Sequence, residues 1–414
     1  MTTIINNEHK KLNVPNLRFP EFQGEWEEST IGEMFDLYSG NTPSRLNKEH
    51  FKGAVNWISS GELKDHYIYS SKEQISEEAA KNLKLLPVGT FVIAIYGLEA
   101  EGVRGTGSIT QEPSTISQAC MSFIPKGVIE NEFLYSWYKK HGNVIGIRYA
   151  QGTKQQNLSY DILEKFRIAY PNTKEQEKLN KFISLLDKRI ATQNKIIDKL
   201  QSLIKGLEDN LLDNPLWEKT YLRSFMQFFS TNSLSWEQLS YDEGEIRNLH
   251  YGLIHGFQTR GINSASLPMI KNEAVPKQYT LCQVGDVAFA DASEDTGEIA
   301  KSVEFVDTIE GDTICGLHTI HGRDIKNRTV VGFKGFAFNS RYFHNQIKRL
   351  AQGTKVFSIT ANNLSSCYVY LPDLDTQTVI VRLLKSYEEQ LIIDRMILKQ
   401  YEKQKQYLLR QMFI

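Results

Sequence analysis

Two long stretches of the chain carry apolar residues at helical spacing. The first lies between Pro171 and Pro215, and the second covers residues 373–414. Their apolar positions recur three or four residues apart, as in a heptad, and proline would break a helix at either end of the first stretch. The apolar positions are Leu179, Phe182, Ile183, Leu186, Ile190, Ile196, Ile197, Leu200, Leu203, Ile204, Leu207 and Leu211 in the first stretch, and Ile380, Leu383, Leu384, Tyr387, Leu391, Ile397, Leu398, Tyr401, Leu408 and Met412 in the second. Each stretch predicts a helix of about 40 residues, roughly 60 Å long.

The apolar face of each predicted helix needs a partner. Each helix could pack on its own globular domain, but we favour packing of the two helices on each other as an antiparallel coiled coil. The predicted interface consists of Leu186, Ile190, Ile197, Leu200 and Leu207 with Tyr387, Leu391, Leu398, Tyr401 and Leu408. Polar residues interrupt both helices at equivalent places, and Arg189 opposite Asp394 or Gln390 would suit helices whose midpoints meet.

The chain contains an internal duplication. Ala150-Gln151-Gly152-Thr153-Lys154 recurs as Ala351-Gln352-Gly353-Thr354-Lys355, at an offset of 201 residues. Residues 148–213 align on 349–414 without a gap, with 11 identities in 66 positions that include Pro171 on Pro372 and Gln176 on Gln377. Since solenoid repeats are only about 20–50 residues long, this period predicts two similar tandem domains.

The segments before the two helices have a mixed pattern. They are rich in glycine, aromatic and β-branched residues, and they combine strand-like runs such as 89–96 and 284–290 with short helical stretches. We predict an α+β fold with two pseudo-symmetric globular domains, 1–170 and 215–372, each followed by a long helix, 171–214 and 373–414. Trp26 with Trp236, and Gly89 with Gly285, are the landmarks that we expect to correspond.

Composition narrows the function classes. Lys and Arg number 48 against 49 Asp and Glu, so a nucleic-acid function must rest on local chemistry because net charge is −1. The longest uncharged apolar run, 85–98, has 14 residues, too few to span a bilayer, and residues 1–11 lack a signal-peptide core. We therefore predict a cytoplasmic protein. The four cysteines, Cys120, Cys282, Cys315 and Cys367, form no CxxC pair and indicate no disulfide framework.

The sequence offers no convincing catalytic or metal site. The run 291–295, with Glu298 and Lys301, could suggest a metal-dependent nuclease, but the usual Glu-x-Lys spacing is absent. Cys315, His318 and His321 are possible zinc ligands, yet on a strand the two histidines would point to opposite faces. Asn214-Pro215-Leu216-Trp217 is similar to a methyltransferase loop but lacks its third residue, proline. We predict no catalytic residues, no metal and no cofactor in this chain.

Polar loops beside strands are the remaining candidates. Their Lys, Arg and Thr side chains can donate to phosphates, and Arg, Asn and Gln can read base edges by paired hydrogen bonds. The alternative is that they are ordinary solvated loops. The candidate DNA-binding residues are Arg104, Thr106, Thr153, Lys154, Gln155, Gln156, Asn157, Gln258, Thr259, Arg260, His318, Thr319, Thr354 and Lys355.

The order of these features resembles a known family. Residues 14–22 (Val-Pro-Asn-Leu-Arg-Phe-Pro-Glu-Phe), with Gly24 and Trp26, are similar to the opening of DNA-specificity subunits of Type I restriction–modification systems. The duplicated layout of globular segment, Ala-Gln-Gly-Thr-Lys, proline, Glu175-Gln176 and long helix also resembles that family. The runs 291–295 and 316–320 resemble stretches of its recognition domains. The second copy departs from the pattern, because Thr376 precedes Gln377 where a glutamate is expected.

The resemblance implies a non-catalytic DNA-binding subunit. Each recognition domain would read one half of a bipartite, asymmetric site in double-stranded DNA, and the coiled coil would fix the spacing of the halves. Two methyltransferase subunits and translocase–nuclease restriction subunits would be its partners, and these would carry S-adenosylmethionine, ATP and Mg. Two other classes stay open, namely a duplicated scaffold that binds no nucleic acid and an enzyme hidden in the globular domains.

Overall fold

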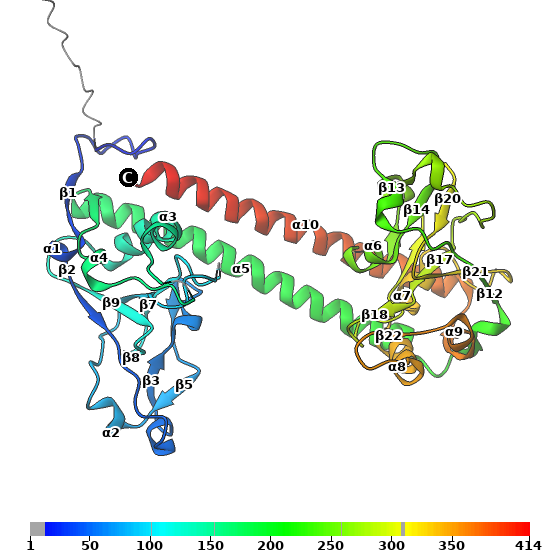
Figure 1. The fold of residues 1–414 in the computed structure, drawn as a ribbon, viewed down its shortest axis with the longest axis horizontal. Helices are drawn as coiled ribbons and strands as arrows, with labels where there is room; N and C mark the ends of the chain where they lie inside the picture. The colour runs from blue at the N-terminus through cyan, green and yellow to red at the C-terminus, as the bar shows by residue number, and fades with distance from the viewer. Residues whose placement is uncertain (1–12, 101, 153, 258, 308–310) are drawn as a thin grey trace, which may run out of the picture. The chain divides into compact units, whose positions relative to one another are not determined.

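The computed structural model describes residues 13–414 except 101, 153, 258 and 308–310. The chain forms two compact units, of which unit 1 comprises Met1–Gln193 with Ile397–Ile414 and unit 2 comprises Asn194–Met396. Helices α5 (Thr173–Leu212) and α10 (Leu374–Met412) are the two long helices, and their ends lie within two residues of the predicted ones. Each unit therefore contains a globular part and half of each long helix, a division that differs from the four consecutive segments predicted from the sequence (Figure 1).

Unit 1 is built on a five-stranded sheet of order β2-β9-β6-β7-β4, a three-stranded sheet β5-β3-β8 and the pair β1-β10. Its strands are β1 (Glu27–Thr30), β2 (Phe35–Ser39), β3 (Val55–Ile58), β4 (Tyr67–Ile68), β5 (Glu73–Ile75), β6 (Phe91–Ala94), β7 (Gly107–Thr110), β8 (Ser114–Ile116), β9 (Cys120–Pro125) and β10 (Arg167–Tyr170). Its shorter helices are α1 (Ile31–Met34), α2 (Glu77–Ala80), α3 (Asn131–Tyr149) and α4 (Tyr160–Leu163).

Unit 2 repeats this plan with a five-stranded sheet β12-β21-β17-β19-β15, a four-stranded sheet β13-β16-β14-β20 and the pairs β11-β23 and β18-β22. Its strands are β11 (Glu218–Tyr221), β12 (Met226–Phe229), β13 (Leu239–Ser240), β14 (Arg247–Leu249), β15 (Gly261–Ile262), β16 (Met269–Ile270), β17 (Val287–Ala290), β18 (Ala292–Ser293), β19 (Ser302–Phe305), β20 (Thr313–Cys315), β21 (Thr319–Asp324), β22 (Phe357–Ser358) and β23 (Tyr368–Leu371). Its shorter helices are α6 (Tyr251–Gly256), α7 (Phe333–Ala337), α8 (Arg341–Leu350) and α9 (Ala361–Ser366).

Strand register shows which positions of the two units correspond. Gly89 and Gly285 both have positive φ. Gly89 donates to the Thr110 carbonyl in unit 1, and Gly285 donates to the equivalent Phe305 carbonyl in unit 2. This predicted correspondence is therefore confirmed. The pairing of Trp26 with Trp236 is wrong. Trp26 precedes β1 and Trp217 precedes β11, whose partner strands β10 and β23 align at the 201-residue offset. The offset between Trp26 and Trp217 differs from 201 residues because the two globular parts differ by insertions.

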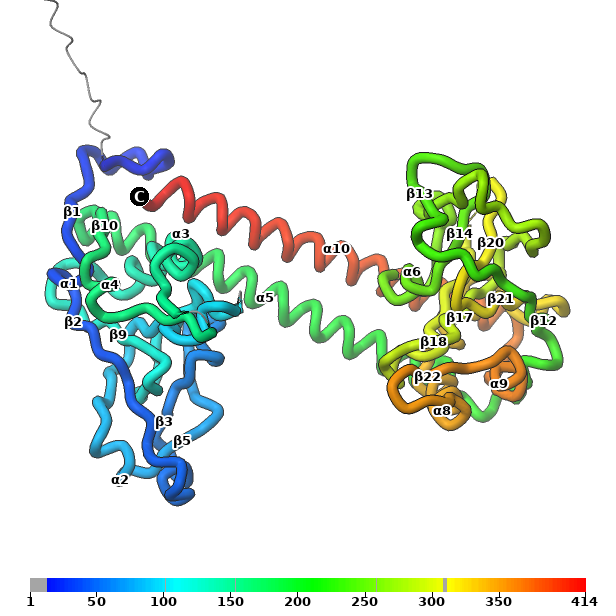
Figure 2. Tube along the Cα trace, in the orientation of Figure 1, coloured from blue at the N-terminus to red at the C-terminus, as the bar shows by residue number. Residues whose placement is uncertain are grey.

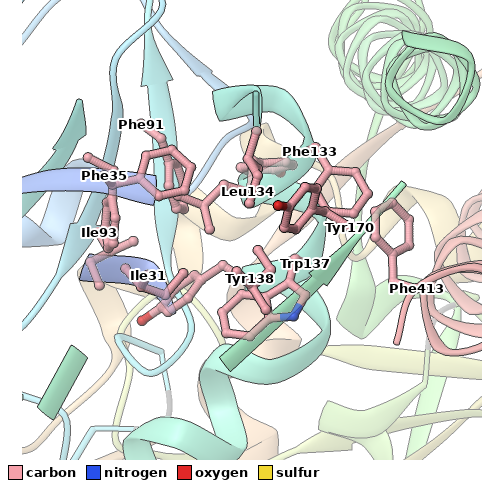
Figure 3. Close-up of a cluster of buried hydrophobic side chains, with 14 of the residues drawn as sticks. Ile31, Phe35, Phe91, Ile93, Phe133, Leu134, Trp137, Tyr138, Tyr170 and Phe413 are labelled. Carbon is pink, nitrogen blue, oxygen red and sulfur yellow. The ribbon is translucent and has the colours of Figure 1, made fainter. Parts of the chain in front are cut away.

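The core of unit 1 is rich in aromatic side chains. Phe35, Phe91 and Phe133 are at most 1% exposed, and they pack with residues of α3 and of the last turn of α10 (Figure 3). Phe413, just after α10, joins this cluster with its ring centroid 5.2 Å from that of Phe133. The last turn of α10 and Phe413 are therefore part of the core of unit 1. Because Phe133 and Phe413 are far apart in the sequence, no local pattern predicts this contact.

The long helices pack antiparallel within each unit. In unit 1 Asp187 pairs with Lys405, and the Arg189 guanidinium lies 4.6 Å from the Tyr401 ring centroid. In unit 2 Gln390 donates to Asp394 on its own helix. The expected pairing of Arg189 with Asp394 or Gln390 joins residues of different units and stays a prediction. Of the predicted interface residues, Ile197 and Leu408 are buried and the others are half-buried. Among the described helices none has the length and apolar content needed to cross a membrane.

Candidate nucleic-acid interface

The repeated Ala-Gln-Gly-Thr-Lys sequence forms a closed loop in each unit. In unit 1 Gln151 and Asn157 exchange two backbone hydrogen bonds of 2.8 and 2.9 Å, and in unit 2 Gln352 and Ser358 exchange the same two at 3.0 and 2.8 Å. Each loop follows a helix, α3 or α8, and leads toward the strand before a long helix. The same segment is therefore presented at equivalent places in both units.

The glycine of this sequence is required by the loop geometry. Gly152 has φ of +117° and Gly353 has φ of +134°. A Cβ at Gly152 would lie 2.1 Å from the carbonyl oxygen of Gln155, and one at Gly353 would lie 1.9 Å from that of Val356. Only glycine fits a backbone of this kind. The repeat thus marks a loop geometry that the two units share.

The tips of both loops present polar side chains to solvent. Lys154 and Gln155 are exposed in unit 1, as are Thr354 and Lys355 in unit 2. Sequence reasoning missed Arg148 and Arg349, which are exposed one turn before each loop and align at the same offset. The sequence offered one signal for them, because arginine occupies both of these aligned positions of the duplication. Two exposed cations per loop suit binding to a phosphate backbone.

A second predicted loop lies beside the first one in unit 1. The Leu98 backbone N–H donates to the Gln156 backbone carbonyl at 3.1 Å, and the Gln156 backbone N–H donates to Glu99 Oε2 at 2.9 Å. Arg104 packs along Gly146 of α3, where a Cβ would lie 3.0 Å from its Cγ. The structure therefore brings Arg104 to the helix that leads into the Gln151–Asn157 loop. Thr106 donates its hydroxyl to the Val103 carbonyl at 2.7 Å, within its own turn.

In unit 2 the corresponding neighbours are Asp291 and His318. The Asp291 amide donates to the His318 carbonyl and Ile359 donates to the Asp291 carbonyl, both at 3.0 Å. The exposed His318 ring, on a residue with φ of +53°, contacts the Asp291 carboxylate at 3.0 Å. The trace in Figure 2 shows β18 beside β22, which places the run after Asp291 against the second loop. Thr319 is only 3% exposed, and its hydroxyl donates to the Gly316 carbonyl.

Of the predicted residues Thr259 and Arg260, only Arg260 contacts the long helices. Thr259 donates its hydroxyl to the Gly261 carbonyl at 2.7 Å. The Arg260 guanidinium contacts Glu208 of α5 at 2.7 Å and Glu388 of α10 at 2.5 Å. These contacts favour a structural role for Arg260, because its donors are occupied by buried carboxylates. Thr153 and Gln258 lie outside the described residues.

His66 occupies the position in unit 1 that Arg260 occupies in unit 2. The His66 carbonyl accepts from Ile109 and the Arg260 carbonyl accepts from Glu304, each at 2.8 Å and each just before the edge strand. The His66 ring contacts Asp187 of α5 and Glu132 of α3, both at 2.8 Å. Asp187 aligns with Glu388 at the 201-residue offset. A cation in each globular part is therefore bound to the same position of a long helix.

This histidine predicts a pH dependence. Burial disfavours the charged ring, but hydrogen bonds to Asp187 and Glu132 outweigh it and raise the pKa of His66 above 6.5. Because the folded pKa is the higher one, the stabilisation is complete below about pH 6.5 and is lost as pH rises through the folded pKa. We expect the difference in unfolding free energy between wild type and His66→Gln, on the order of 1 kcal/mol at about pH 6, to shrink at higher pH.

Chemical denaturation between pH 6 and pH 9 measures this difference. The comparison with the variant is needed because Lys139, whose pKa is lowered to about 8 by burial and by Lys405, changes stability in the opposite direction in the same unit. A difference independent of pH would contradict a charged His66.

Carboxylates in and beside the acidic run of unit 2 contact basic side chains of the protein. The Glu298 carboxylate contacts Lys301 at 3.0 Å and His255 at 3.3 Å. Asp291 contacts His318, as described above. Among the described residues, the sole group of three or more potential metal ligands within reach of one another is Cys282, Cys315 and His321. The geometry therefore gives no support to a nuclease centre built on the run 291–295.

Two similar α+β units joined by long helices, each with a polar loop of the same geometry, define a two-domain recognition protein. Residues 23–202 match the family described as the Type I restriction modification DNA specificity domain. The MjaIX specificity subunit of Methanocaldococcus jannaschii is 29% identical over 185 residues, which are 42% of this chain and 42% of that protein. The MjaVIII specificity subunit of the same organism is 24% identical over 412 residues, 94% of this chain and 91% of that one.

A solved structure has the same fold. The S subunit of a Type I restriction–modification system from M. genitalium aligns with a TM-score of 0.58 at 15% identity, and the alignment covers 97% of this chain and 99% of that one. The chain is therefore similar to Type I restriction–modification specificity subunits in sequence over most of its length, and in fold. The predicted family and fold class are confirmed.

Proposed function

We propose that this chain is the DNA-specificity subunit of a Type I restriction–modification complex and has no catalytic activity of its own. Each globular part reads one half of a bipartite, asymmetric site in double-stranded DNA. Two methyltransferase subunits, which bind S-adenosylmethionine, and restriction subunits, which use ATP and Mg, carry out the reactions. The matches of both parts of the chain to specificity subunits support this proposal.

The observation that carries the proposal is the pair of equivalent polar loops. Both are closed by the same backbone pairing, and both present exposed cations, Arg148 and Lys154 in unit 1 and Arg349 and Lys355 in unit 2. The loops differ beyond the lysine, where Gln155 in one copy corresponds to Val356 in the other. Shared cations suit the uniform phosphate backbone, while different side chains beside them suit two different half-sites.

An exchange of recognition segments tests the proposal. Replacement of residues 20–170 by the matching segment of a relative with a different DNA site should change one half-site of the methylated sequence and leave the other half unchanged. Methylome sequencing of cells that express the hybrid with its methyltransferase measures this. The matched control exchanges 216–372 and should change the other half-site. The proposal fails if either hybrid changes both half-sites. It also fails if neither hybrid changes a half-site.

A further inference from the structure

Unit 2 contains a buried cluster of two cysteines and a histidine. Cys282 precedes β17, Cys315 ends β20 and His321 lies in β21, and their exposed fractions are 6%, 3% and 1%. The two sulfurs are 3.6 Å apart, and a ring nitrogen of His321 lies within 4.8 Å of both. The backbone holds them there, since Cys282 donates to the Thr313 carbonyl at 2.8 Å. Three residues far apart in sequence thus converge on one point.

The separation of the sulfurs matches a shared cation better than a disulfide. In a disulfide the two sulfurs are about 2.05 Å apart. Two thiolates bound at about 2.3 Å to one tetrahedral zinc ion lie about 3.8 Å apart. The observed 3.6 Å is close to the second arrangement. Thiolate and imidazole are also the ligands that zinc prefers.

The surroundings of His321 are those of a histidine that binds a metal. Its Nε2 lies 2.7 Å from the carboxylate of Asp286, so Nδ1 is the nitrogen that keeps a lone pair for a cation. A carboxylate bound to the second ring nitrogen is the usual partner of a metal-bound histidine. Arg323 contacts the same carboxylate through two nitrogens, at 2.8 and 2.7 Å, and also donates to the Leu281 carbonyl beside Cys282. The negative charges of two thiolates would neutralise a divalent cation, and the positive charge of Arg323 neutralises that of Asp286.

Unit 1 provides an internal comparison. By strand register, Cys282 corresponds to Leu86, since each donates to the first residue of a matching strand, Thr313 of β20 or Ser114 of β8. Cys315 corresponds to Ile116. His321 corresponds to Ser122 and Asp286 to Thr90, because Val287 and Phe91 pair with Gly322 and Phe123. The shared fold is therefore built in unit 1 with none of these ligands. The chemistry of the cluster belongs to unit 2 alone and is not a requirement of the fold.

We propose that Cys282, Cys315 and His321 form a zinc site in unit 2, with Asp286 orienting the histidine and water in the fourth coordination position. Sequence reasoning rejected a metal here because it grouped His318 with His321. The structure places His318 on the exposed turn, and it supplies Cys282 as the third ligand instead. Two of the ligands, Cys315 and His321, bracket the turn that carries His318 and Thr319. Zinc would therefore fix both ends of this turn.

The test uses the full-length chain and zinc itself. Chain purified under reducing conditions, incubated with zinc and freed of excess metal should contain about one zinc per molecule by elemental mass spectrometry. The double variant Cys282→Leu, Cys315→Ile introduces the residues of unit 1 and should lose this zinc. Cys367→Ser, a buried cysteine outside the cluster, is the matched control and should retain it. Replacement of zinc by cobalt should give thiolate-to-metal charge-transfer absorption in the wild type and in Cys367→Ser, but not in the double variant.

The result does not depend on one variant folding well. His321→Ser, which also introduces the residue of unit 1, should lower zinc affinity at least about tenfold. Removal of zinc from the wild type by a chelator should lower its thermal midpoint, and added zinc should restore it. Zinc absent from the loaded wild type, zinc retained by the double variant, or a Cys282–Cys315 disulfide under reducing conditions would each overturn the proposal. None of these measurements requires DNA, so the site and the proposed function are tested separately.

Discussion

Arg260→Met is expected to destabilise unit 2 by about 3 kcal/mol, because the variant leaves two buried carboxylates without their cation. Glu208 and Glu388 are 8% and 6% exposed, and burial raises the pKa of each above 4.5 even with Arg260 present. Removal of the guanidinium should raise both values further. Since the folded pKa values exceed the unfolded one, stability is lost as pH rises above about 4.5, and the variant should recover as pH falls toward 5.

Denaturant unfolding of the full chain at pH 5 and pH 8 measures this effect. Arg223→Met removes an exposed arginine of the same unit and should change stability by less than about 0.5 kcal/mol. Addition of Glu208→Gln and Glu388→Gln to the Arg260→Met variant should restore much of the loss. If Arg260→Met instead weakened DNA binding and left stability unchanged, the original prediction of a DNA contact would be correct and the structural role wrong.

Gln377→Glu is expected to destabilise unit 2 by about 3 kcal/mol, and Gln176→Glu should do the same to unit 1. The Gln377 amide nitrogen donates to the carbonyls of Pro372 and Arg328, each at 3.0 Å, while its oxygen accepts from Val330 at 3.0 Å. Gln176 makes the same three bonds with Pro171, Val128 and Glu130, and both glutamines are 0% exposed. Glutamate keeps the shape but places an oxygen against two carbonyl oxygens.

The matched control is Gln404→Glu, on the exposed face of α10, which should alter stability by less than about 0.5 kcal/mol. The Gln377→Glu variant should be least unstable at low pH, where a protonated carboxyl can still donate one hydrogen bond. Thermal or denaturant unfolding followed separately for the two units measures the loss. Equal stability of Gln377→Glu and Gln404→Glu would show that this glutamine does not hold the start of the long helix.

The duplication predicted more of the structure than any single motif. It located both long helices to within two residues, because a heptad pattern and flanking prolines are local properties of the sequence. It also marked Gln176 and Gln377, although the reason for the repeat, a three-way hydrogen bond to a loop some 48 residues away, is visible only in the fold. The predicted correspondence of Trp26 with Trp236 was wrong, because insertions change the spacing of equivalent residues along the sequence. Strand pairing identifies the equivalent residues directly.

For the candidate site, too, part could be predicted from the sequence and part is decided by the tertiary structure. Residue type alone indicated which loops carry polar groups, but burial decides which of those groups reach solvent, as Lys355 does and Thr319 does not. The sequence by itself determined two tandem copies, two long amphipathic helices and a family. Only the tertiary structure decided that Arg260 binds the helices and that Cys282, Cys315 and His321 meet. Partners in a buried cluster are chosen by strand register and packing, which join residues that no local pattern connects.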